Sequence, residues 1–201
     1  MICAIDTETT GLTIDCGIVE IAIVPLLANF EPDPNITPFH LYVNPGTHHL
    51  QDLPLPCKAM LINGLSRDKL AQEGIHYSLL AGRILGWMMA NQIDKIDPLA
   101  QNWAFDAKML ELNLGSDNMA AIFSRHIRDA KRLAIALEDR AHLDDPDAAP
   151  LFKSHSLQNL AKQFEIDPGQ AHTATADAIT CAKVYRHLLT YMEDPKCQPS
   201  S

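Results

Sequence analysis

The chain begins Ile2-Cys3-Ala4-Ile5-Asp6-Thr7-Glu8-Thr9-Thr10-Gly11-Leu12, and its fold can be inferred outward from this stretch. The apolar residues predict a buried strand that ends at two carboxylates, Asp6 and Glu8, before a turn. Residues i and i+2 of a strand point to the same face, so these two side chains lie next to each other. Their like charges repel unless a cation lies between them or one carboxylate is protonated. The alternative is a pair of solvated acids at a strand end.

The composition is that of an ordinary globular protein. The chain has 201 residues, of which 47% are hydrophobic and 20% charged, enough for one domain with a sizeable core. The net charge of −9 argues against a protein that coats long nucleic acids by charge alone. It is compatible with a protein that grips a nucleic-acid end through bound cations.

Cysteine usage and hydropathy bear on location. The five cysteines form no CxxC pair, so neither a disulfide framework nor a zinc knuckle is expected, and a reducing cytoplasm is the default. No apolar run approaches the ~20 residues of a membrane span. The first residues lack the basic start and long apolar core of a signal peptide. We therefore expect a cytoplasmic protein that does not contact a membrane.

The remaining hydrophobic pattern predicts a mixed sheet. Residues 1–6, 17–25 and 39–43 form three strands that follow one another as an antiparallel meander. Strands at 97–101 and 121–129 alternate with helical segments, which is typical of an α/β fold with parallel strands.

The segments between and after these strands complete the expected domain. A helix is expected from His76 to Asn91, where large apolar residues recur at helical spacing. Residues 138–150 are acidic and rich in alanine and proline, which predicts an exposed loop. No linker divides the chain, so we expect a single domain over residues 1–192 and a flexible tail at 193–201.

Further acids lie on the predicted helices and strands. Asp106 begins the helix after the fourth strand, and Asp177 lies at the edge of the inward face of the last helix. Carboxylate oxygens without nitrogen or sulfur ligands suit Mg²⁺ or Mn²⁺. Glu20 interrupts the second strand, where it either faces solvent or stands behind Asp6 and Glu8.

Three segments, in this order, resemble the motifs of the DEDDh, or DnaQ-like, 3′–5′ exonucleases, a family that includes proofreading subunits of DNA polymerases. They are Asp6-Thr7-Glu8-Thr9-Thr10-Gly11-Leu12, Asn102-Trp103-Ala104-Phe105-Asp106 and His172-Thr173-Ala174-Thr175-Ala176-Asp177. One such motif is a weak signal, whereas three in order over nearly the whole chain are specific. The second motif departs from the family pattern, because Gln101 precedes it and Trp103 is bulky.

The resemblance implies an RNase H-like fold, in which helices flank both sides of a mixed five-stranded sheet. It also implies a two-metal reaction, in which Asp6, Glu8, Asp106 and Asp177 hold two divalent ions, Mg²⁺ or Mn²⁺. By the same resemblance, His172 takes the proton of the attacking water as general base. A nucleoside 5′-monophosphate then leaves from the 3′ end.

The resemblance further places the 3′-terminal nucleotide against the turn after the first motif. The residues expected to bind the substrate are Thr9, Thr10, Gly11, Leu12, Asn102 and Trp103. For Trp103 two roles are open, because its ring either stacks on a base or packs in the core.

Three functions stay open. The Asp6–Leu12 motif resembles DNA-trimming members most, which favours the 3′ end of single-stranded or frayed DNA as the partner. An exoribonuclease would use the same chemistry, since RNA is distinguished by contacts to its 2′-OH. The third is an inactive polymerase-associated subunit, against which the presence of all five catalytic residues argues. A polymerase partner stays open in each case.

Overall fold

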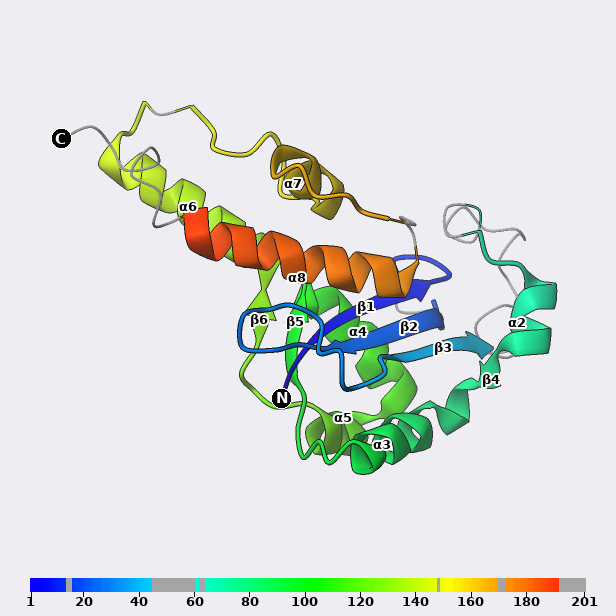
Figure 1. Ribbon diagram of the computed structural model, residues 1–201. Coiled ribbons are helices and arrows are strands. Elements are labelled where there is room, and N and C mark those ends of the chain that lie inside the picture. The colour runs from blue at the N-terminus through cyan, green and yellow to red at the C-terminus, as the bar shows by residue number, and fades with distance from the viewer. Residues whose placement is uncertain (14–15, 45–60, 62–63, 148, 170–172, 192–201) are drawn as a thin grey trace.

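A mixed sheet forms the centre of the computed structural model, which describes residues 1–13, 16–44, 61, 64–147, 149–169 and 173–191. Six strands lie in the order β4-β3-β2-β1-β5-β6 (Figure 1). Their bounds are β1 Ile2–Thr9, β2 Ile18–Pro25, β3 Phe39–Asn44, β4 Ile75–His76, β5 Asp97–Ala100 and β6 Arg128–Asp129. β1, β2 and β3 pair antiparallel, whereas β5 joins β1, β6 joins β5 and β4 joins β3 in parallel. The predicted class, an α/β fold in which parallel strands extend an antiparallel meander, is confirmed. The tail expected at 193–201 lies outside the described residues.

The sheet has one strand more than the five that were expected. The additional strand is β4, in which Ile75 and His76 pair with Val43 and Asn44. The sequence predicts a helix from His76, but α3 begins only at Leu80. Two residues are too few to produce a recognisable alternation, so only the pairing with β3 defines this strand.

The strand predicted at 121–129 is wrong over most of its length. α5 (Ser116–Ile122) occupies its first part, and only Arg128–Asp129 pairs as β6. Ile122 and Phe123 are buried in the core between the sheet and α3 to α5. A short apolar run fits a strand and a buried helix end equally well, and here the packing favours the helix.

Helices cover both faces of the sheet (Figure 1). One layer contains α3 (Leu80–Ala90), α4 (Trp103–Leu114) and α5, and the other contains α6 (Ala130–Asp144), α7 (Leu157–Gln163) and α8 (Ala174–Tyr191). The 3-10 turn η2 (Tyr77–Leu79) leads into α3, and α2 (Arg67–Glu73) packs beside β3.

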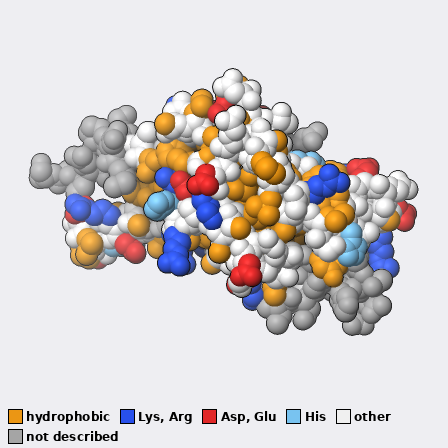
Figure 2. All heavy atoms as spheres, turned by 90° about the horizontal axis from the view of Figure 1, so that it is seen from below, with side chains coloured by type: hydrophobic (Ala, Val, Ile, Leu, Met, Phe, Trp, Pro, Cys, Tyr) orange, Lys and Arg blue, Asp and Glu red, His pale blue; other side chains and the backbone are white. Residues whose placement is uncertain are grey.

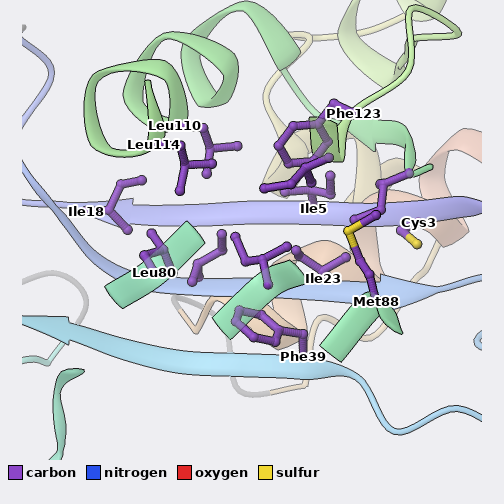
Figure 3. Close-up of a cluster of buried hydrophobic side chains, with 14 of the residues drawn as sticks. Cys3, Ile5, Ile18, Ile23, Phe39, Leu80, Met88, Leu110, Leu114 and Phe123 are labelled. Carbon is purple, nitrogen blue, oxygen red and sulfur yellow. The ribbon is translucent and has the colours of Figure 1, made fainter. Parts of the chain in front are cut away.

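The alternation of β1 divides its side chains between two cores. Cys3 and Ile5 enter the core under α3, α4 and α5, where Figure 3 shows them among side chains of the neighbouring strands and helices. Ala4 enters the core under α6, α7 and α8. Because the alternation continues along the strand, Asp6 and Glu8 leave β1 on the α8 side.

α6 extends into the segment that was expected to be an exposed loop. It continues to Asp144, so the loop prediction is wrong for residues 138–144. Glu138 faces the returning chain, since its Oε1 accepts a hydrogen bond from the backbone N–H of Phe152 at 3.1 Å and its Oε2 lies 2.6 Å from Nε2 of His155. Glu138, which the sequence placed in an exposed loop, therefore holds the segment that contains Phe152 and His155 against α6.

The surface mixes hydrophobic and polar groups. From below, the side of α3 and α5, hydrophobic side chains lie between scattered charged ones (Figure 2). Leu79, Met89 and Leu112 are among the large hydrophobic residues that stay exposed. Within the described part of the chain, no helix combines the length and the apolar character needed to cross a membrane.

Candidate active site

Three carboxylates meet at the end of β1. Asp6 and Glu8 project from this strand, and Asp177 projects from the first turn of α8, which packs on β1 and β2. One carboxylate oxygen of each residue lies within 4.8 Å of the other two. Asp177 is buried, whereas Asp6 and Glu8 are half-buried. The structure thus brings three of the four predicted acids within reach of one small cation.

Asp106 reaches the same strand from the opposite helical layer. It lies in the first turn of α4, is 6% exposed, and accepts at Oδ1 a hydrogen bond from Oγ1 of Thr7 at 2.7 Å. Thr7 lies between Asp6 and Glu8 in sequence and therefore points to the other face of β1. The fourth acid is joined to β1 through this threonine, close enough for its charge to act on Asp6.

Burial makes two of the four acids, Asp6 and Asp106, difficult to ionise. Burial raises the pKa of Asp6 well above its usual range, and the charges of Asp106, Asp177, Glu8 and Glu20 raise it further. Burial also raises the pKa of Asp106 to about 7, although hydrogen bonds to its carboxylate act against the increase. Buried acids this close need protons or cations to balance their charge.

The donor atoms of the cluster fit hard divalent cations. Among the described residues, the group that could hold an ion consists of carboxylates alone. Mg²⁺ and Mn²⁺ bind to a few carboxylates together with water and substrate phosphate, whereas zinc prefers nitrogen and sulfur ligands.

Glu20 is buried beside the cluster. It lies directly opposite Glu8 in the pairing of β2 with β1 and is 2% exposed. Its Oε1 lies 2.8 Å from Nε2 of His40 on β3. The solvent-facing alternative for Glu20 is therefore excluded, and His40 is its partner.

The turn after β1 presents one side chain outward. Oγ1 of Thr9 donates a hydrogen bond to the carbonyl of Gly11 at 2.6 Å. A Cβ atom at Gly11 would lie only 2.6 Å from Sγ of Cys16, so a larger residue here would force the Cys16 side chain to move. Thr9 and Thr10 are buried, whereas Leu12 is 82% exposed. Among the predicted substrate-binding residues of the turn, Leu12 is the one whose side chain faces outward.

The other predicted site residues differ in where they lie. Trp103 is 7% exposed and makes a T-shaped contact with Phe123 at a centroid distance of 5.3 Å, which corresponds to the core-packing alternative. Asn102 is exposed immediately before α4. His172 lies outside the described residues.

Comparison with protein families gives one match to this chain. The family model described as RNase_T: Exonuclease matches residues 3–185. The chain belongs to this exonuclease family. The match spans the strand, turn and helices that carry the predicted site residues, and it confirms the resemblance to the DnaQ-like 3′–5′ exonucleases. No curated protein sequence matches the chain.

Solved exonuclease structures share the fold. E. coli exonuclease I in complex with a dT13 oligonucleotide has a TM-score of 0.69 and 20% identity over 97% of this chain and 42% of that chain. The zinc-bound form of its complex with single-stranded DNA has a TM-score of 0.70 and 20% identity over 98% and 41%. Cell-death related nuclease 4 has a TM-score of 0.68 and 15% identity over 94% and 63%. The chain thus spans about two fifths of exonuclease I, and the shared architecture is the RNase H-like fold.

Asp129 was not among the predicted site residues, but it determines how α4 begins in this member of the family. It is 8% exposed; Oδ1 accepts from the N–H of Arg132 and Oδ2 from the N–H of Trp103, each at 3.0 Å. Asn102, at the N-cap of α4, makes no side-chain cap. One carboxylate therefore caps α6 and also α4, the helix that carries Asp106. An aspartate before a helix is a visible N-cap signal, but no sequence signal connects it to α4.

Asp129→Asn is expected to lower the free energy of unfolding by about 1–3 kcal/mol. Asparagine has one acceptor oxygen, so one of the two helix N–H groups loses its partner and faces an amide NH₂ group. Urea unfolding measures the change. Ser156→Ala, which removes the cap of α7 alone, is the matched control and should cost about 1 kcal/mol. A free energy of unfolding equal to that of the unmodified chain would contradict the double cap.

A cavity of about 390 Å³ opens beside Asp177. Its walls are α7, the segment that follows α7, and the first half of α8, and they are largely apolar. Asp177 is thus one of the residues that line this cavity.

Proposed function

We propose that this chain is a metal-dependent 3′–5′ exonuclease that releases nucleoside 5′-monophosphates and prefers DNA. The observation that carries the proposal is the cluster of Asp6, Glu8 and Asp177, whose oxygens lie within 4.8 Å of one another, with Asp106 joined to it through Thr7. Burying several acids together costs free energy that packing alone does not return. This cost supports a working catalytic site over an inactive, partner-binding subunit.

The four acids are the proposed ligands of two divalent ions, and Mg²⁺ or Mn²⁺ suits their oxygen donors. When bound, the ions activate the attacking water and neutralise the charge that develops on the phosphate. Asp6 and Glu8 hold their positions through the pairing of β1, and Asp177 through the packing of α8. Thr7 orients Asp106 by donating a hydrogen bond to its Oδ1. We place Glu20 behind these ligands, where it adds negative charge next to Glu8.

We place the 3′-terminal nucleotide on the turn that follows β1. Leu12 is exposed there and can pack against the sugar or base. Gly11 is half-exposed in the same turn, so its backbone can contact the nucleotide. Thr9 and Thr10 contribute backbone groups rather than side chains, because both side chains are buried. Asn102 lies exposed at the start of α4, where it can contact the nucleotide from the other helical layer.

The preference for DNA is supported by the form of the first motif and by the solved structures with the same fold. Exonuclease I is solved in complex with dT13 and with dA16 oligonucleotides. An enzyme that discriminates against RNA must sense the 2′-OH of the terminal nucleotides, and the turn around Leu12 is where we expect that contact.

The test is a cleavage assay with three 5′-labelled substrates: single-stranded DNA, duplex DNA with a mismatched 3′ end, and RNA. With Mg²⁺ or Mn²⁺, we expect a ladder that shortens from the 3′ end of single-stranded DNA, more slowly from RNA. EDTA should stop the reaction, and added Mn²⁺ should restore it. Faster shortening of RNA would make the chain an exoribonuclease. If no substrate is cleaved with either metal, the proposed activity is refuted and the chain is better explained as an inactive, polymerase-associated subunit.

His172 is the proposed general base. In the sequence it lies two residues before Ala174, where α8 begins, and the first turn of this helix holds Asp177. A neutral imidazole can accept a proton from the attacking water near neutral pH.

His172→Ala is therefore expected to lower kcat by about 10²–10⁴-fold. The affinity for Mn²⁺, measured by isothermal titration calorimetry, should stay close to that of the unmodified chain, because the carboxylates are intact. Lost Mn²⁺ binding would instead identify His172 as a metal ligand.

A further inference from the structure

A row of side chains leads from the carboxylate cluster across the sheet to β3. Glu8 lies opposite Glu20 of β2, and Glu20 lies opposite Tyr42 of β3. Directly opposite residues project from the same face of a sheet. Neighbouring strands are about 4.8 Å apart, so Tyr42 is about 10 Å from Glu8 along this row.

The far end of the row carries a positioned cation. Nζ of Lys69 on α2 lies 3.0 Å from the hydroxyl oxygen of Tyr42 and 4.2 Å from the centroid of its ring. The ring of His40 approaches Tyr42 edge-on at 5.0 Å. Ser66 caps α2, and its Leu70 is buried against β2 and β3, which fixes the helix that carries the lysine.

The ammonium group stays charged in this position. Its hydrogen bond with Tyr42 raises the pKa of Lys69, and the charges of Glu73 and Glu20 raise it further. In a chain with a net charge of −9, a fixed cation next to an acid cluster is where a polyanion would meet attraction instead of repulsion.

The face of β3 that carries this cation is partly open to solvent. α8 packs on β1 and β2, whereas His40 is exposed and Tyr42 is half-exposed. In Figure 1, α2 lies beside the end of β3, at the same end of the sheet as the last residues of β1. A nucleic-acid strand whose 3′ end lies at the acids can therefore extend over β3 towards α2.

We propose that Lys69, held by Tyr42, binds a backbone phosphate of the substrate strand beyond the phosphate that is cleaved. This inference rests on the proposed exonuclease function. An ammonium group has three N–H donors, and Tyr42 engages one, which leaves two for phosphate oxygens. The ring of Tyr42 is covered by the lysine, so the contact is to the sugar–phosphate backbone and not to a stacked base. Binding through a phosphate carries no base sequence preference.

The test compares Lys69→Gln on two substrates, a thymidine dinucleotide with a single phosphodiester and an oligothymidylate of roughly twelve nucleotides. The dinucleotide lacks the phosphate that Lys69 would reach. KM for the longer strand should rise about tenfold, which is the effect of losing one charged hydrogen bond, and KM for the dinucleotide should rise far less. The slope of log KM against log salt should fall by about one. Lys69→Arg should restore the slope, and Tyr42→Phe should give an intermediate KM.

Lys153→Gln, at an exposed lysine before α7, is the control for a general loss of positive charge. Equal effects of Lys69→Gln on both substrates, or effects no larger than those of Lys153→Gln, would overturn the proposed phosphate contact. Failure of the proposed function looks different, because the unmodified chain would then cleave neither substrate. In that case, fluorescence anisotropy with the labelled oligothymidylate in EDTA tests the contact alone. Binding that is absent, or that does not change in Lys69→Gln, would refute it.

Discussion

Asp6→Asn is expected to stop the shortening of DNA while making the metal-free protein more stable. The substitution keeps the shape of the side chain but removes a charge from the centre of the carboxylate cluster. Activity should fall by about 10³-fold or more, the scale on which the loss of a charge-stabilising group acts in enzymes. Stability should rise, because the repulsion that raises the pKa of Asp6 is relieved. Each 1 kcal/mol gained corresponds to about 2–4 °C in Tm for a chain of this size.

Lower activity together with higher stability distinguishes a cation-binding acid from an ordinary buried acid, whose loss would lower stability. Single-turnover cleavage of labelled DNA and thermal unfolding in EDTA measure them on one protein sample. Asp117→Asn, which removes an exposed acid from the first turn of α5, is the matched control. It should leave activity unchanged and lower stability by less than about 1 kcal/mol, because an acid at a helix start interacts with the helix dipole. Asp6→Asn protein that is inactive but less stable would show a structural role for Asp6, and an active variant would remove it from the catalytic set.

The second large effect is a loss of stability in the metal-free protein as the pH rises. The pKa of Asp106 is raised by burial from 3.8 to about 7, and that of Asp6 is raised in the same direction. A raised pKa means that the folded state favours the protonated carboxyl group. The contribution of Asp106 to the free energy of unfolding is therefore fully present below pH 3.8 and is lost as the pH rises towards 7. The shift of Asp106 alone corresponds to roughly 4 kcal/mol.

Divalent cations should reverse this loss. Ions bind the ionised carboxylates of the folded chain, so Mn²⁺ should raise Tm strongly at about pH 8 and weakly at about pH 5. An excess of about 100 Kd contributes roughly 2.7 kcal/mol. Differential scanning calorimetry with EDTA or Mn²⁺ across this range measures the difference. Asp106→Asn should flatten the pH dependence, and a metal effect independent of pH would contradict ion binding at these acids.

The sequence predicted the centre of this protein better than its edges. β1 is apolar on both faces, and its period of two placed Asp6 and Glu8 side by side, as observed. The two-residue strands β4 and β6 exist through pairing with a neighbour, so no local pattern marks them. The same holds for the C-terminal half of α6, where the contact between Glu138 and His155 joins segments that the sequence separates.

At the site too, the sequence identified individual residues, but it did not predict the contacts between distant segments. The spacing of the motifs pointed to Asp177 and Asp106, but the route of Asp106 to β1 through Thr7 depends on packing. Asp129 carries a visible N-cap signal for its own helix and none for α4. Glu20 could be assigned to the buried side only once β3 supplied His40 as its partner.

The positions of Asp106 and Asp177 have a consequence for how the chain matures. Asp106 comes from the helical layer on one face of the sheet and Asp177 from the layer on the other, so each face must acquire its helices before the acids can meet. A folding intermediate in which only one layer has docked lacks at least one of them. The proposed metal site therefore forms only when α4 and α8 have both docked on the sheet, and it is lost when either helix detaches.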